Sequence, residues 1–196
     1  MSTLTKTFLT PEAYLEIERK AEYKSEYCNG EMFAMAGVSR RHDAIGVQLQ
    51  FLLSQHLRRK KCRVNSSSMR ILVTPAGLYT YPDLSVVCEE PRYTDSAADT
   101  LVNPAFVVEI LSPSTEAYDR GKKAKLYRAM PSLLEYLLIA QDSYDVELYR
   151  RQADGTWSVI EASGLDSSIE LTTIGYTLQL RELYEPILPE DAPTAA

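Results

Sequence analysis

The sequence has few cysteines and no long apolar run. Cys28, Cys62 and Cys88 are the three cysteines of a 196-residue chain, and none of them stands in a CxxC pair. This odd number and spacing disfavour a zinc site or a disulfide and predict reduced core thiols in a cytoplasmic protein. No stretch reaches the roughly 18 to 20 apolar residues of a membrane helix, and residues 1–6 lack the pattern of a signal peptide. We therefore expect a soluble protein with no membrane partner.

An excess of positive charge is also missing, since the formal net charge is −6. Proteins that hold nucleic acid mainly through phosphate contacts usually present a basic face. Binding of nucleic acid would therefore depend on local basic patches or on a bound metal. Basic residues cluster at 58–63, which also suits the solvated end of a helix, and at 120–128. The sequence has no glycine-rich phosphate loop, nucleotide-binding fingerprint or Ser-His-Asp order.

The composition is typical of one globular domain. The chain is 45% hydrophobic and 24% charged, and its length is sufficient for a sizeable core. We predict a single domain over residues 1–184. The Pro- and Ala-rich residues 185–196 have few apolar anchors and are predicted to form a flexible tail.

Capping and turn signals organise the first third of the chain. Thr10-Pro11 is typical of a helix start, and a short helix is predicted to about residue 21. Asn29-Gly30 predicts a two-residue hairpin turn whose second arm ends near Gly37. Ser39 can cap a long amphipathic helix over 41–59, in which apolar residues recur at three- and four-residue spacing.

The rest of the chain reads mainly as strands. Strands are predicted over 62–65, 69–74 and 80–88, with a turn at 75–77, and the apolar run 105–111 predicts a strand buried on both faces. Between them, 89–103 is predicted to be a loop. A helix capped by Ser114 or Thr115 should continue to about Met130, followed by strands at 134–140, 145–151, 156–161 and 169–178. The fold class is therefore α/β, a central mixed sheet flanked by helices, with an N-terminal hairpin and C-terminal strands in addition.

Glu109 carries the most information about function. A carboxylate within an apolar strand is unfavourable unless it is paired, protonated or bound to a metal. Ser112-Pro113-Ser114 ends the strand directly after it, so Glu109 lies near the carboxyl end, where ligands gather in open α/β sheets. The alternative is a strand-end glutamate that faces solvent.

Asp83 is the second candidate. Pro82 cannot donate to a sheet ladder, so Pro82-Asp83 marks a strand start or a bulge beside a buried apolar run. Together with Glu109, this carboxylate would supply oxygen ligands for a hard cation such as Mg²⁺ or Mn²⁺. The alternative is a plain turn.

Lys123 is the third candidate. Asp119, Lys123 and Tyr127 are spaced four residues apart and share one helix face, whereas Lys122 and Lys125 point elsewhere. An ammonium beside two carboxylates can position an attacking water and offset charge on a phosphate. The alternative is a surface pair between Asp119 and Lys123.

His42 and Glu26 are less specific candidates. His42 begins the long helix and is predicted either as a metal ligand or base or as a capping or surface residue. Glu26 stands just before the hairpin turn and is equally ambiguous. Ser112, at the end of the strand that carries Glu109, is a further accessory candidate.

Several motifs in their joint order resemble a known family. They are Tyr27-Cys28-Asn29-Gly30-Glu31, Ala36-Gly37, His42, Pro82-Asp83, 107–115, 119–123 with Tyr127, 131–136 and 178–184. This set is similar to the Uma family of restriction-endonuclease-like proteins, which is expanded in cyanobacteria and belongs to the PD-(D/E)XK nuclease superfamily. The resemblance covers nearly the whole chain.

The resemblance implies an α-β-β-β-α-β core in which Asp83 and Glu109 hold a divalent metal and Lys123 is the catalytic lysine. The usual lysine of the superfamily stands two residues after the acid, where this sequence has Leu111. The lysine of this family is instead on the following helix, which fits Lys123. A DNA substrate is also implied, and a homodimer by analogy with restriction-like enzymes that cut two strands with two sites.

Three functional hypotheses follow. The first is an endonuclease that uses Mg²⁺ or Mn²⁺ to hydrolyse DNA phosphodiester bonds. The second is a catalytically inactive nuclease fold that serves as a dimeric binding module, which the acidic balance favours. The third is a hydrolase of small phosphate esters, which would need no broad basic groove. For the first, Asp83, Glu109 and Lys123 are the catalytic set, with accessory residues His42, Glu26, Ser112, Asp119 and Tyr127.

Overall fold

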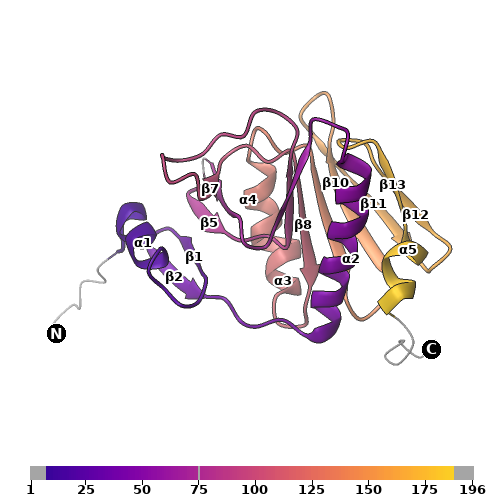
Figure 1. Cartoon of the computed structure of the whole chain (residues 1–196), viewed down its shortest axis with the longest axis horizontal. Helices are drawn as coiled ribbons and strands as arrows, with labels where there is room; N and C mark the ends of the chain where they lie inside the picture. The colour runs from indigo at the N-terminus through magenta and orange to yellow at the C-terminus, as the bar shows by residue number, and fades with distance from the viewer. Residues whose placement is uncertain (1–7, 75, 188–196) are drawn as a thin grey trace.

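Mixed sheets and flanking helices make up the part of the chain that the computed structural model describes, residues 8–74 and 76–187 (Figure 1). One sheet of five strands has the order β2 (Glu31–Ala34), β1 (Ser25–Cys28), β5 (Leu78–Thr80), β4 (Arg70–Val73), β7 (Thr100–Leu101). A sheet of six strands has the order β11 (Trp157–Ser163), β10 (Asp145–Arg151), β9 (Glu135–Ala140), β8 (Phe106–Leu111), β6 (Leu84–Val87), β3 (Arg63–Ser66). The pairs β8–β9 and β4–β7 are parallel and the other pairs are antiparallel, so the predicted mixed α/β class is confirmed.

The N-terminal elements lie at one end of the molecule, as Figure 1 shows in indigo. Helix α1 (Pro11–Glu18) begins as predicted, with the Thr10 side chain accepting a hydrogen bond from the backbone of Ala13 at 3.2 Å, although it ends three residues early. Strands β1 and β2 form the predicted hairpin, and both turn residues have positive φ, 50° at Asn29 and 87° at Gly30. Such angles define the turn that matches the twist of a hairpin.

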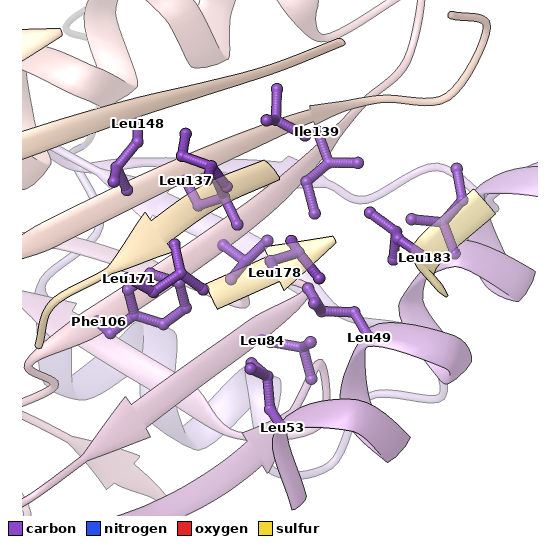
Figure 2. Packing of buried hydrophobic residues seen from close by; sticks show 14 of the residues in the cluster. Leu49, Leu53, Leu84, Phe106, Leu137, Ile139, Leu148, Leu171, Leu178 and Leu183 are labelled. Atoms are coloured by element: carbon purple, nitrogen blue, oxygen red, sulfur yellow. The ribbon is translucent and has the colours of Figure 1, made fainter. Parts of the chain in front are cut away.

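Helix α2 (Arg40–Leu57) confirms the predicted long helix and covers one face of the six-stranded sheet. The Ser39 side chain caps it by accepting from the backbone of His42 at 3.1 Å. Its apolar stripe is part of one core that includes residues of the sheet strands β6, β8, β9 and β10. Residues of β12 (Ser168–Leu171), β13 (Tyr176–Gln179) and α5 (Leu180–Tyr184) belong to the same core. Figure 2 shows this contact, with Leu49 and Leu53 of α2 directed toward Leu84 and Phe106.

Strand β8 is buried along its whole length, as predicted for the apolar run. Because side chains alternate across a strand, Phe106, Val108 and Ile110 enter the core beneath α2. Val107 and Leu111 enter a second core on the other face, with α4 (Ala124–Arg128). Glu109 shares this second face, and it therefore points toward the chain segment that carries Lys123.

Three predicted elements are interrupted. The strand expected over 80–88 is two strands in different sheets, β5 and β6, because Pro82 breaks the ladder between them. The strand expected over 169–178 is the hairpin β12–β13, which turns through Gly175 at a φ of 59°. The loop expected over 89–103 includes the short strand β7.

The prediction of one regular helix that continues to about Met130 is also wrong, because the middle of this segment is not α-helical. It consists of α3 (Glu116–Tyr118), a π-helical turn over Asp119–Lys123 and α4. Thr115 precedes α3 but makes no side-chain capping bond. Turns of π-helix are rare and are frequently found at functional sites.

The prediction for the cysteines is wrong for two of them. Cys62 and Cys88 form a disulfide, whereas Cys28 is a buried free thiol as predicted. The cause is the antiparallel pairing of β3 with β6, in which Arg63 lies opposite Val87, so that Cys62 and Cys88 are the next residues across the ladder. Neither their spacing of 26 residues nor their surroundings in sequence reveals this pairing. The argument from reduced thiols to a cytoplasmic location therefore no longer holds.

Some predictions concern residues outside the described ranges, which are residues 1–7, Pro75 and residues 188–196. Most of the predicted tail therefore lies outside the described residues. The first tail residues, Glu185–Ile187, form a 3₁₀ turn. Among the described residues, none of the helices has the length and apolar character needed to cross a membrane.

Candidate active site

Glu109 is 5% exposed, near the carboxyl end of β8. Its Oε1 atom accepts a hydrogen bond from the Tyr127 hydroxyl at 2.7 Å and lies 2.8 Å from Lys123 Nζ. The alternative of a solvent-facing glutamate is therefore wrong. Tyr127 belongs to α4, so the strand and the helix converge on this carboxylate.

Lys123 is 4% exposed and surrounded by carboxylates. Its Nζ atom lies 3.0 Å from Glu26, 2.8 Å from Glu109 and 3.6 Å from Asp119. Asp119 and Lys123 are the first and last residues of the π-helical turn, and both point inward, while Lys122 and Lys125 are exposed. The choice of Lys123 by its helix face is thus consistent with the geometry, and the alternative of a surface pair is wrong.

The electrostatics of this group are unusual because acids outnumber the cation. Burial, together with the nearby Asp83 and Asp119, raises the pKa of Glu109 to about 8, although Lys123 opposes the shift. Burial also raises the pKa of Asp119. Burial alone would lower the pKa of Lys123, but the three carboxylates outweigh it, and the pKa rises above its ordinary value. Lys123 is therefore held as a cation.

Asp83 lies between β5 and β6, beside Glu109 but with different partners. Its Oδ2 atom accepts the backbone N–H of Ile110 at 2.7 Å, and its Oδ1 atom is 2.9 Å from His42 Nε2. The ladder between β6 and β8 ends at Leu84 and Val108, so the N–H of Ile110 is available to Asp83. His42 is buried and its Nδ1 atom has no hydrogen-bond partner. Asp83 therefore links the start of α2 to the carboxyl-terminal part of β8.

Glu26 enters the group from the hairpin at the N-terminal end. It is part of β1, accepts a hydrogen bond from the Thr80 hydroxyl and contacts Lys123. Thr80 and Tyr118, whose ring lies 5.9 Å from Lys123 Nζ, were not found from the sequence. No local pattern marks Thr80, because its approach to Glu26 depends on the antiparallel pairing of β1 with β5.

Two predicted features have other partners. Ser112 bonds to the hydroxyls of Ser114 and Thr115, and it borders the same cleft as Glu109 and Lys123. Of the basic residues at 120–128, Lys123 alone enters the cleft, while Arg120 pairs with Glu116 and Glu147. The basic residues 58–61 are exposed at the end of α2, as expected for a solvated helix end.

Comparison with known proteins identifies the family. Residues 11–181 match the family described as "Uma2: Putative restriction endonuclease". The chain belongs to the Uma2 family. Two proteins of Synechocystis sp. strain PCC 6803, both described as uncharacterized, are similar to it. The first, slr1290, is 39% identical over 90% of this chain and 91% of its own length, and the second, sll1609, is 36% identical over 88% and 97%.

A solved structure shows the same fold. The crystal structure of "a putative nuclease belonging to DUF820" from Anabaena variabilis superposes with a TM-score of 0.75 at 20% identity, over 92% of this chain and 99% of that one. The Uma2 chain thus has a nuclease-like fold within a restriction-endonuclease family.

The carboxylates of the Uma2 chain suit a hard divalent cation. Mg²⁺ is usually bound through one or two carboxylates with waters and substrate phosphates, rather than by a complete protein cage. Within the described ranges, no group of three or more His, Cys, Asp or Glu residues that could enclose a metal is found. Asp83 and Glu109 border one cleft, and the carboxyl groups around Lys123 outnumber this single cation. The donor set therefore fits a two-carboxylate site.

The cleft has a volume of about 530 Å³, within the range typical of ligand sites. Glu109, Lys123 and Asp83 form its floor, while Met35–Val38 and Ser112–Thr115 form part of its walls. The segment Met35–Val38 also borders a second cleft, which shares His42 and Asp83 with the first.

Proposed function

We propose that this Uma2-family chain is a metal-dependent endonuclease that hydrolyses DNA phosphodiester bonds. One observation carries the proposal: a buried lysine is held charged among carboxylates at the floor of an open cleft, next to Asp83. A purely structural ion pair would have balanced charges and no opening. The family and the nuclease-like fold support the same conclusion.

In this proposal, Asp83 and Glu109 hold Mg²⁺ or Mn²⁺, which when bound polarises a phosphate oxygen and lowers the pKa of water. Lys123 donates hydrogen bonds to a phosphate oxygen or to the attacking water and offsets the charge that develops on the phosphate. Tyr127 fixes one oxygen of Glu109, and His42 with the Ile110 N–H fixes both oxygens of Asp83. These contacts set the orientation of the two carboxylates before substrate arrives.

The test is cleavage of plasmid and oligonucleotide DNA with Mg²⁺ or Mn²⁺. Asp83→Asn, Glu109→Gln and Lys123→Met should each lower kcat/KM by about a hundredfold or more. Lys125→Met changes an exposed lysine two residues further along the chain; it is the matched control and should keep wild-type cleavage. If the three site variants also keep it, the assignment is wrong.

Two further measurements separate the rival functions. Calorimetric titration with Mn²⁺ should show binding that the Asp83→Asn variant loses, whereas absence of binding would favour an inactive binding module. Hydrolysis of mononucleotide esters without cleavage of DNA would favour a hydrolase of small phosphate esters. The proposal includes a symmetric dimer, the commonest form of assembly, and light scattering at twice the chain mass of 22.1 kDa would support it.

A further inference from the structure

Phe33 lies exposed beside the proposed catalytic group. It is part of β2, directly opposite Glu26 of β1 in the hairpin register. Directly paired residues of an antiparallel ladder place their side chains on the same face, with Cβ atoms about 5 Å apart. Glu26 contacts Lys123 at 3.0 Å, so the Phe33 ring stands next to the residues around Lys123, and both Phe33 and Glu26 border the cleft.

The packing of the hairpin does not account for this ring. The neighbouring residue Met32 points to the other face of β2 and packs against the aromatic core of Tyr14, Tyr27 and Tyr79. Phe33 remains 50% exposed, and within the described residues it makes no ring-to-ring or cation–ring contact. A flat apolar surface is thus available at the mouth of the cleft.

The depth of the catalytic group restricts what can reach it. Glu109 and Lys123 are 5% and 4% exposed, whereas Phe33 at the mouth is half exposed. A flexible single strand can bend one phosphate down to the floor and leave its base at the mouth. In a duplex the faces of each base are covered by neighbouring base pairs, so an aromatic ring can stack only on an unpaired base.

The charge of the protein favours stacking as the source of affinity. Lys123 is the one lysine or arginine of the described residues that borders this cleft, and carboxylates surround it. With a net charge of −6, long-range attraction to phosphates is not available. Stacking of bases on aromatic side chains does not depend on phosphate contacts and is tolerant of sequence.

We propose that Phe33 is the platform on which an unpaired base stacks while the adjacent phosphate reaches Lys123, so that the substrate is single-stranded DNA. This inference rests on the proposed nuclease function and adds its substrate class. Phe33 is then a specificity-determining residue, since it selects for the unpaired state of the strand rather than taking part in the chemistry.

The test compares two exposed phenylalanines. Phe51, on the outer face of α2, is 59% exposed and borders neither cleft, so Phe51→Ala is the matched control for Phe33→Ala. With Mn²⁺ and an end-labelled single-stranded oligonucleotide, Phe33→Ala should lower kcat/KM about tenfold, mainly through KM. Phe51→Ala should stay within twofold of wild type, and Phe33→Trp should retain activity because it keeps an aromatic face. Wild type should cleave the single strand at least about tenfold better than a blunt duplex of the same sequence.

A binding readout tests stacking apart from cleavage. In the Phe33→Trp protein, oligo(dT) should quench the introduced indole, while an oligomer of abasic residues should not. The wild-type protein, with Trp157, supplies the background signal. Equal kcat/KM for Phe33→Ala and wild type, absence of quenching, or a duplex cleaved as well as the single strand would each overturn this inference and leave the nuclease function standing. Failure of wild type to cleave any DNA would overturn both.

Discussion

Two clusters of charged residues differ in their burial and in how their charges are balanced. The cleft cluster consists of Lys123 with the carboxylates of Glu26, Asp83, Glu109 and Asp119. Three of these acids, Glu26, Glu109 and Asp119, share one lysine, and burial raises the pKa of both Glu109 and Asp119. The fold therefore holds Glu109 and Asp119 where their charged form is disfavoured.

The N-terminal cluster joins α1, β4 and the segments around Tyr81 and Asp99 with a more even balance. Arg70 donates to the Thr100 hydroxyl at 2.8 Å and to the Tyr81 hydroxyl at 2.7 Å, and it pairs with Asp99 at 3.0 Å. The Tyr81 hydroxyl in turn donates to Glu18 at 2.9 Å. The remaining members are Arg19 and Asp95.

The pKa of Asp99 moves in the opposite direction to those of Glu109 and Asp119. Hydrogen bonds from Arg19 hold the pKa of Asp99 well below its ordinary value. The N-terminal cluster is thus stabilised by its own ion pairs, whereas the cleft cluster has more carboxyl groups than cations beside an opening. Strongly perturbed groups in a cleft are typical of functional sites. The contrast indicates that one cluster stabilises the fold, whereas the other has the features of a functional site.

The largest expected effect comes from removing the central cation of the N-terminal cluster. Arg70→Met removes the buried cation that donates to the Tyr81 and Thr100 hydroxyls and pairs with the partly exposed Asp99. Loss of these two charge-assisted hydrogen bonds should decrease the free energy of unfolding by about 3 kcal/mol. Urea denaturation measures the change, with Lys125→Met expected to stay within about 0.5 kcal/mol as an exposed control. A decrease below about 1 kcal/mol would show that the two clusters do not differ in this way.

A divalent cation should act on the cleft cluster alone. At a Mn²⁺ concentration a hundred times its Kd, the free energy of unfolding should rise by about 2.7 kcal/mol, because the ion binds only the folded state. Thermal melts with Mn²⁺ and with a chelator measure this gain. Arg70→Met should keep the gain, and Asp83→Asn combined with Glu109→Gln should lose it. A gain that persists in the double variant would place the ion elsewhere.

The part of the site that depends on local sequence could be predicted. Helical spacing selects Lys123 over Lys122 and Lys125, and an acid within the apolar run of β8 marks Glu109. The hairpin, α2 and the burial of β8 follow from turn chemistry and periodicity in the same way. The catalytic roles of Lys123 and Glu109 stay a prediction.

The part that depends on strand pairing could not be predicted. The disulfide of Cys62 with Cys88 and the approach of Thr80 to Glu26 both require the order of strands within two sheets. Phe33 was missed for a related reason, since its position beside Lys123 depends on how the hairpin docks on the rest of the fold. The turn chemistry encodes the hairpin register, but no local pattern encodes the docking.

The smallest expected effect is the acid response of the N-terminal cluster. The pKa values of Asp95 and Asp99 are lowered in the folded protein, chiefly by hydrogen bonds from Arg19. A lowered folded pKa contributes stability that is present above the unfolded value, about 3.9, and is lost as the pH falls through the folded value. The side chains are 39% and 34% exposed, so solvent screening keeps this contribution small.

Between pH 5 and pH 2, Asp95→Asn combined with Asp99→Asn should therefore slightly flatten the fall in the free energy of unfolding. The control is Glu161→Gln, which changes an exposed carboxylate on β11 and should leave the fall unchanged. A steeper fall in the double variant would mean that these aspartates are not stabilised by Arg19, and the contrast with the cleft cluster would then rest on Arg70 alone.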